Sequence, residues 1–186
     1  MVAPAVTRQR RLLSLGGAAL AIGFLVVMTL SGHVRESGQF VRFVAAGVLP
    51  ETPADVDRVE LTAGRRRWVF RRSPGVWRLE PGSRAVSPSL ATHLDDSVKF
   101  MHASAPIRVL ERSEWAEQGL REFGLDRPAY GAALYHGERR LLAADFGSPN
   151  PQKVLQYMRL EGHDQVYVMS RFIGEEWEQA LAELGR

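Results

Sequence analysis

The sequence predicts an α+β fold, with one N-terminal transmembrane helix followed by a domain of antiparallel β-meanders and packed helices. Three observations support this class. An uncharged apolar run lies near the N-terminus, short segments farther on alternate apolar and polar residues, and a stripe of helical period follows each group of these segments. Because the same order occurs twice, we expect two similar lobes, with helices on one face of the strands.

The apolar run extends from Leu12 to Leu30 and follows Arg8, Arg10 and Arg11. At about 1.5 Å per residue, a helix of this length reaches across the hydrocarbon core of a bilayer. A cleaved signal peptide has a shorter apolar run, of about 7–15 residues, and Thr29-Leu30-Ser31 is a poor cleavage site. A buried helix of a soluble domain fits less well, because no face of the run is polar. The pattern therefore favours a retained anchor.

Four parts of the chain follow from this anchor: a cytoplasmic tip at 1–11, a transmembrane helix at 12–32, a juxtamembrane segment at 33–54 and an α+β domain at 55–186. The arginines that precede the run predict that the N-terminus stays in the cytoplasm. In a bacterial cell the main domain then lies in the periplasm, and the lipid bilayer of the inner membrane is the first partner.

Two pairs of small residues in the run have the spacing of helix–helix contacts. Gly17 with Ala21 and Ala19 with Gly23 are each four residues apart, which allows a second membrane helix to approach closely. Such residues are common in all membrane helices, so the pairs predict a contact without identifying its partner.

Charge and cysteine content exclude several classes of function. The formal net charge is +3, but without the three N-terminal arginines the chain has 21 basic and 21 acidic residues. The basic balance is therefore an orientation signal, and we expect no nucleic-acid partner. The absence of cysteine rules out disulfides, thiolate catalysis and cysteine-ligated metal sites.

The juxtamembrane segment has one apolar stripe of helical spacing, formed by Phe40, Phe43, Val44 and Val48. Such a helix fits the membrane surface, with nearby arginines toward lipid phosphates, or packing on the domain. The pattern does not decide between these two interpretations.

The first meander begins at Asp55, where Val59 and Leu61 alternate with polar residues. Turns at Ala63-Gly64 and Ser73-Pro74-Gly75 separate it into three strands. We expect one face to carry the aromatic and aliphatic side chains Trp68, Phe70, Trp77 and Leu79. We expect the other face to be rich in arginine, because Arg65, Arg67 and Arg71 alternate with the aromatic positions.

A helix is predicted next, with Ser87 as N-cap and Pro88 at its first position. Its stripe of Leu90, Leu94, Val98 and Met101 would cover the apolar face of the meander. A short strand at 107–110, a short helix from 113 to about 123 and a bend at 125–128 complete the first half.

The second half repeats this order. Strands are predicted at 130–135, 139–146, 155–160 and 165–169, and a closing helix carries Ile173, Trp177, Ala180, Leu181 and Leu184 at helical spacing.

Five short segments give the chain a resemblance to a known family. They are Val56-Asp57-Arg58-Val59-Glu60-Leu61, Gly75-Val76-Trp77-Arg78-Leu79, Phe123-Gly124-Leu125-Asp126-Arg127-Pro128, Asp145-Phe146-Gly147 and Gln165-Val166-Tyr167-Val168. Together with the membrane helix, this order resembles the family called domain of unknown function 4340. The resemblance implies a bacterial envelope protein, often encoded near ABC-type exporter or gliding-motility auxiliary components. It implies no catalytic residue, and this chain has a single copy where larger members have more.

Motifs of well-marked chemistry are absent from the sequence, including the Walker A loop, G-x-S-x-G and H-E-x-x-H. None of the five histidines has a second histidine at i+2 or i+4, and His93 with Asp96 fits a surface contact better than a catalytic pair. Asp126 is better placed to brace a bend than to act as an acid. We therefore expect no catalytic residue, no cofactor and no metal.

The arginines of the meander are the unusual charge cluster. The cluster consists of Arg65, Arg66, Arg67, Arg71, Arg72 and Arg78. One interpretation is a solvated sheet face with Glu60 and Glu80 as cross-strand partners. The other is contact with anionic lipid headgroups or an acidic partner protein.

Two functional hypotheses follow, and a purely structural anchor is a third. The first is a non-enzymatic, membrane-tethered periplasmic module that binds envelope proteins as an accessory subunit of a transport or assembly complex. The alternative is a periplasmic enzyme or ligand-binding domain acting on lipid or cell-wall material. It requires Arg66, Arg72, Asp126 or His163 to converge on a pocket.

Overall fold

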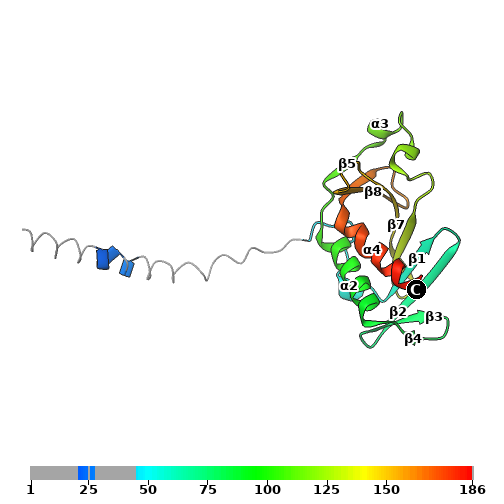
Figure 1. Ribbon diagram of the computed structural model, residues 1–186, viewed down its shortest axis with the longest axis horizontal. Coiled ribbons are helices and arrows are strands. Elements are labelled where there is room, and N and C mark those ends of the chain that lie inside the picture. Colours follow the sequence, from blue (N-terminus) through cyan, green and yellow to red (C-terminus); the bar gives the residue numbers. More distant parts are fainter. Residues whose placement is uncertain (1–20, 25, 28–44, 186) are drawn as a thin grey trace, which may run out of the picture. The chain divides into compact units, whose positions relative to one another are not determined.

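A computed structural model describes residues 21–24, 26–27 and 45–185. Within this part of the chain, nine strands form one sheet in the order β4-β3-β2-β1-β6-β7-β8-β9-β5 (Figure 1). All eight pairs of neighbouring strands are antiparallel. The α+β class and the antiparallel meanders are therefore confirmed.

The first half is a four-stranded meander followed by a helix. Its elements are β1 (Arg58–Ala63), β2 (Arg66–Ser73), β3 (Val76–Glu80), β4 (Arg84–Ala85) and α2 (Pro88–Ala103). Gly64 and Gly75 form the two hairpin turns at positive φ, which glycine adopts without steric cost. The predicted cap is confirmed, because the Leu90 amide donates to the Ser87 hydroxyl oxygen at 3.1 Å. The two-residue strand β4 was not predicted, because two residues are too few to show an alternating pattern.

The second half has the same order. It consists of β6 (Tyr130–His136), β7 (Arg139–Pro149), β8 (Leu155–Leu160), β9 (Val166–Ser170) and α4 (Arg171–Leu184). Strand β1 pairs with β6, so the two meanders meet edge to edge in one sheet. The expected similarity of the halves is seen in the order of elements, but they share one sheet and one core and are not separate lobes.

The long helices α2 and α4 pack against each other on one face of the sheet (Figure 1). The predicted apolar stripe of α2 is buried, and so are Ile173, Trp177 and Ala180 of α4. They meet strand residues such as Phe70, Trp77 and Phe146 in the main core. Burial of these large side chains contributes most of the driving force for folding, at about 1.5–3 kcal/mol for each.

The connection between the halves covers part of the opposite face. It contains β5 (Arg108–Leu110), α3 (Arg112–Trp115) and η2 (Leu120–Phe123). Phe123 and Leu125 pack with Val166 of β9 in a second, smaller core. The single helix predicted from 113 to 123 is wrong, because Gly119 at φ 76° separates α3 from η2.

The domain begins before the boundary placed at residue 55. Leu49 is 1% exposed and lies in the main core, and η1 (Pro53–Asp55) follows it. Amides of Gly47 and Leu49 donate to carbonyls in the last turn of α2, at His102 and Met101. Val48, from the predicted juxtamembrane stripe, is not helical and packs against the core. The other three stripe residues, Phe40, Phe43 and Val44, lie outside the described residues.

Most of the predicted membrane helix lies outside the described residues, including Gly17 and Ala19. Residues 21–24 and 26–27 are helical, which includes Ala21 and Gly23. In the described ranges, no helix has both the length and the apolar character needed to cross a membrane.

Candidate functional site

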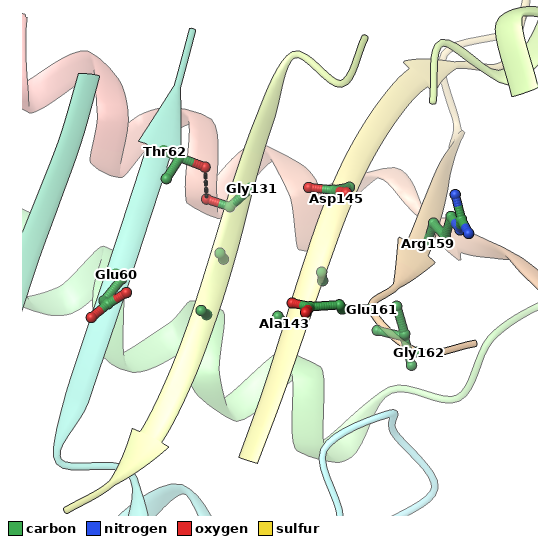
Figure 2. Close-up of a pocket in the computed structure, with 12 residues that line it drawn as sticks. Glu60, Thr62, Gly131, Ala143, Asp145, Arg159, Glu161 and Gly162 are labelled. Carbon is green, nitrogen blue, oxygen red and sulfur yellow. Dashed lines mark hydrogen bonds between the residues drawn. The ribbon is translucent and has the colours of Figure 1, made fainter. Parts of the chain in front are cut away.

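Helices α2 and α4 cover one face of the sheet, and we call the other face the open face. The candidate site is a groove on this open face. Strands β1, β6, β7 and β8 form its base, and its volume is about 320 Å³ (Figure 2). The groove is lined by backbone and side chains of Glu60, Thr62, Gly131, Ala132, Ala133, Ala143, Ala144, Asp145, Arg159, Leu160, Glu161 and Gly162.

Small residues at paired positions create the groove. Gly131 lies opposite Asp145 in the β6–β7 register, and Ala133 lies opposite Ala143. A methyl group at Gly131 would stand 2.9 Å from the Thr62 hydroxyl oxygen and 3.1 Å from an Asp145 carboxylate oxygen. Because glycine has no side chain, a hollow remains at Gly131 between the larger side chains of Thr62 and Asp145, in the middle of the sheet.

The charged side chains at the groove come from different strands. In Figure 2, Asp145 points from β7 toward Gly131, Glu161 reaches toward Ala143, and Arg159 points away from both carboxylates. Asp145 and Arg159 are cross-strand neighbours in the β7–β8 register. Within the described part of the chain, the two side chains attract each other electrostatically, but neither makes a hydrogen bond or a close ion pair. Glu161, by contrast, is ion-paired with Arg140 at 2.9 Å.

Burial raises the pKa of Asp145 above the ordinary carboxyl value of 3.8. Arg159 acts in the opposite direction, and the nearby Glu161 adds to the increase. A cation from a binding partner would stabilise the ionised carboxylate.

Glu60 is held at the border of the groove by a network of contacts. Its carboxylate accepts from Arg67 at 2.6 Å and from the Tyr135 hydroxyl at 3.1 Å. The Arg58 guanidinium carbon lies 4.0 Å from the centroid of the Tyr135 ring. Only 8% of Glu60 is exposed. These contacts fix the Glu60 side chain at the border of the groove, whereas Asp145 and Arg159 can still hydrogen-bond to a binding partner.

The six arginines of the meander do not form one surface. Arg67 binds Glu60, and Arg71 binds Glu80 at 3.0 Å, so the predicted cross-strand partners are confirmed for these two. Arg72 lies on the face of the sheet that α2 and α4 cover, where it contacts Asp95 of α2. Its guanidinium carbon is 4.5 Å from the centroid of the Trp77 ring. Arg78 donates to the Ser83 carbonyl at 2.9 Å.

Arg65 and Arg66 lie exposed at the β1–β2 hairpin, with no ion pair among the described residues. A lipid or acidic-partner role is thus still a prediction, and it is best supported for these two.

The residues of the alternative hypothesis are separated. Arg72 lies beside Trp77, Asp126 in the bend after η2, and His163 in the β8–β9 turn, where the Tyr167 hydroxyl is 3.1 Å from its ring. Neither they nor Arg66 line the groove.

Histidine and acidic residues do not gather into a metal-sized group in the described part of the chain. His93 instead bridges α2 and α4 through Glu176 at 2.8 Å, and His102 contacts the Leu49 carbonyl at 3.0 Å.

The groove was not predicted as a site from the sequence. The available signal was the alternation of small residues at 131, 133 and 143, which in strands share one face. That signal gains meaning only when β6 and β7 are known to lie in the middle of the sheet.

Comparison of the chain with family models, with curated proteins and with solved structures found no match. The resemblance to the domain of unknown function 4340 family therefore stays an expectation from short motifs.

Proposed function

We propose that the chain is a single-pass, membrane-anchored periplasmic module of non-enzymatic type that binds envelope proteins as an accessory subunit of a transport or assembly complex. The proposed contact surface is the groove of the open face, with Asp145 and Arg159 as its charged anchors. A partner segment would bind here if it placed a cationic side chain beside the Asp145 carboxylate and a hydrogen-bond acceptor beside the Arg159 guanidinium.

The observation that carries this proposal is the unequal coverage of the sheet. Helices α2 and α4 bury one face. The groove on the other face has a floor of glycine and alanine, and its Asp145 and Arg159 make no hydrogen bond or close ion pair among the described residues. Small floor residues allow a partner's backbone or side chain to approach the sheet closely, and anchors of opposite charge impose an orientation.

The membrane anchor rests on the sequence alone. The run from Leu12 to Leu30 has no charged residue, and the arginines before it favour a cytoplasmic N-terminus. Tethering would hold the groove within reach of other membrane-bound proteins, which raises their effective concentration.

Co-purification from native membranes in mild detergent tests the proposal. The variants Ala143→Trp, which fills the groove, and Asp145→Lys, which reverses one anchor, are each expected to lose a protein that co-purifies with the parent chain. Val76→Trp is the matched control, because Val76 is exposed in the β2–β3 hairpin, outside the groove.

Thermal unfolding of each purified variant would show that the loss is not due to misfolding. If the parent chain emerged alone from every detergent, or if Ala143→Trp and Asp145→Lys retained the same proteins as Val76→Trp, the proposed surface would be wrong.

A further inference from the structure

We infer that the domain rests on the lipid bilayer through one apolar corner, formed by Phe100, Ile107, Val109, Val154 and Phe172. This inference depends on the proposed membrane anchor but not on the groove. It names a second interaction surface, on a different part of the domain, and its partner is the headgroup and upper acyl region of the lipid.

Contacts in the structure place Phe100, Phe172, Val154 and Ile107 around the ends of the two long helices, and Val109 lies in β5, opposite Tyr167 of β9. The Phe172 ring, at the start of α4, meets the Phe100 ring near the end of α2 with centroids 5.0 Å apart. The Arg171 amide donates to the Val154 carbonyl at 2.9 Å, which sets Val154 beside the start of α4. Ile107 follows α2 by four residues and donates its amide to the Val168 carbonyl at 2.8 Å.

Exposed apolar side chains are concentrated at this corner. From residue 45 to 185, five large hydrophobic residues are exposed, and four of them belong to it: Ile107 at 62%, Val154 at 60%, Phe172 at 43% and Val109 at 39%. The fifth, Val76, lies in the β2–β3 hairpin. Single exposed hydrophobic residues need no explanation, but a group of this kind usually marks an interaction site.

The chain joins the domain at the same corner. Gly47 and Leu49 donate to carbonyls of His102 and Met101, in the last turn of α2, where Phe100 also lies. Residues 33 to 46 separate Gly47 from the end of the predicted membrane helix. Fourteen residues extend at most about 50 Å, so a chain anchored by this helix keeps the corner within that distance of the bilayer.

The charges at the corner also suit a lipid surface. The chain has two lysines, Lys99 and Lys153, and each precedes a residue of the corner, Phe100 and Val154. Both are exposed. A lysine near an anionic bilayer contributes favourably, because its ammonium group meets lipid phosphates. Glu175, one turn into α4, is ion-paired with Arg171 at 3.7 Å. We therefore favour lipid over an apolar protein surface.

Site-directed fluorescence labelling tests the inference, and the lack of native cysteine makes single labels unambiguous. Ile107→Cys and Val154→Cys are made in the full-length chain, with Val76→Cys as the matched control, since all three side chains are exposed. Each is labelled with an environment-sensitive dye and reconstituted into phosphatidylethanolamine and phosphatidylglycerol vesicles that contain lipids with a nitroxide on an upper acyl carbon.

We expect lipid nitroxides to quench the labels at 107 and 154 several times more strongly than the label at 76, with a blue shift only at the corner. Equal, weak quenching at all three positions would overturn the inference. So would a blue shift at 107 and 154 in native membranes that is absent in lipid vesicles, because it would indicate a protein occupant.

Resistance of the chain to alkaline carbonate extraction separates this result from a failure of the anchor. A chain released by carbonate contradicts the membrane anchor of the proposed function as well. A chain that is retained, but whose corner labels report water, contradicts only the corner.

Discussion

Tyr130 of β6 donates its hydroxyl hydrogen to the Gly174 carbonyl of α4 at 2.9 Å, deep in the core. Gln156 completes the junction by donating to the Gly147 carbonyl at 3.0 Å, and it accepts from Arg171 at 2.8 Å. This polar network connects the closing helix to the middle of the sheet. Because it is buried, loss of any member leaves a partner unsatisfied.

Gly174→Ala should destabilise the domain by about 1–3 kcal/mol, the usual cost of overpacking a core. The added methyl group would lie 1.8 Å from the Gln156 amide oxygen and 2.7 Å from the Tyr130 hydroxyl. Gly185→Ala is the control, because the nearest atom to its methyl group would be 3.8 Å away. Urea unfolding measures both variants, and equal stability would contradict the close packing.

Tyr130→Phe should cost roughly 1 kcal/mol at neutral pH, through the lost hydrogen bond. Burial, followed by the Glu178 carboxylate, raises the pKa of Tyr130 above its ordinary value of 10.0. The native state therefore retains a proton that the unfolded state releases, so stability falls as pH rises above about 10. The variant should lose that alkaline dependence. Unfolding midpoints between pH 8 and 11 measure it, and parallel curves for both proteins would argue against this origin.

Arg72→Ala should destabilise by about 1–2 kcal/mol, since the guanidinium stacks on Trp77 and binds Asp95. Trp77 itself donates to Asp95 at 2.9 Å, so the three side chains form one unit. Arg66→Ala, at an exposed position of the same strand, should change stability by less than about 0.5 kcal/mol. Thermal unfolding of both variants at two salt concentrations measures these changes. If Arg72→Ala and Arg66→Ala lost similar amounts of stability, Arg72 would act only as a surface charge.

Asp145→Asn should be at least as stable as the parent at pH 7. Because burial raises the pKa of Asp145, the native state binds its proton more tightly than the unfolded state. Its favourable contribution is complete below pH 3.8 and is lost as pH rises through the higher native pKa. The advantage of asparagine should therefore grow from acid toward neutral pH.

Stability measured from pH 3 to 7 tests this prediction, with Asp126→Asn as the control, because Asp126 lies in the bend after η2 and does not line the groove. A gain that stays constant over the whole range would show that ionisation of Asp145 is not its cause.

The spacing of apolar residues predicted most strands and both long helices. Each of these elements buries one face, and that burial leaves a repeat of apolar residues within a short stretch of sequence. The stripe of α2 is buried as expected, and β8 has the predicted bounds. On the apolar face of the first meander, Phe70 and Trp77 are buried, and Trp68 and Leu79 are partly buried. The short helix after β5 was predicted too long, because the helical pattern around Trp115 does not reveal the positive φ of Gly119.

The sequence by itself determined the class of fold, the order of two meanders with their helices, and the apolar N-terminal run. Only the tertiary structure decided that β1 and β6 pair, and this places Gly131, Ala133 and Ala143 in the middle of one sheet. The physical reason is that alternation along a strand records which face is buried, whereas its neighbours depend on pairing between residues far apart in the chain. The groove beside Asp145 and the apolar corner at Phe172 both arise from such distant contacts.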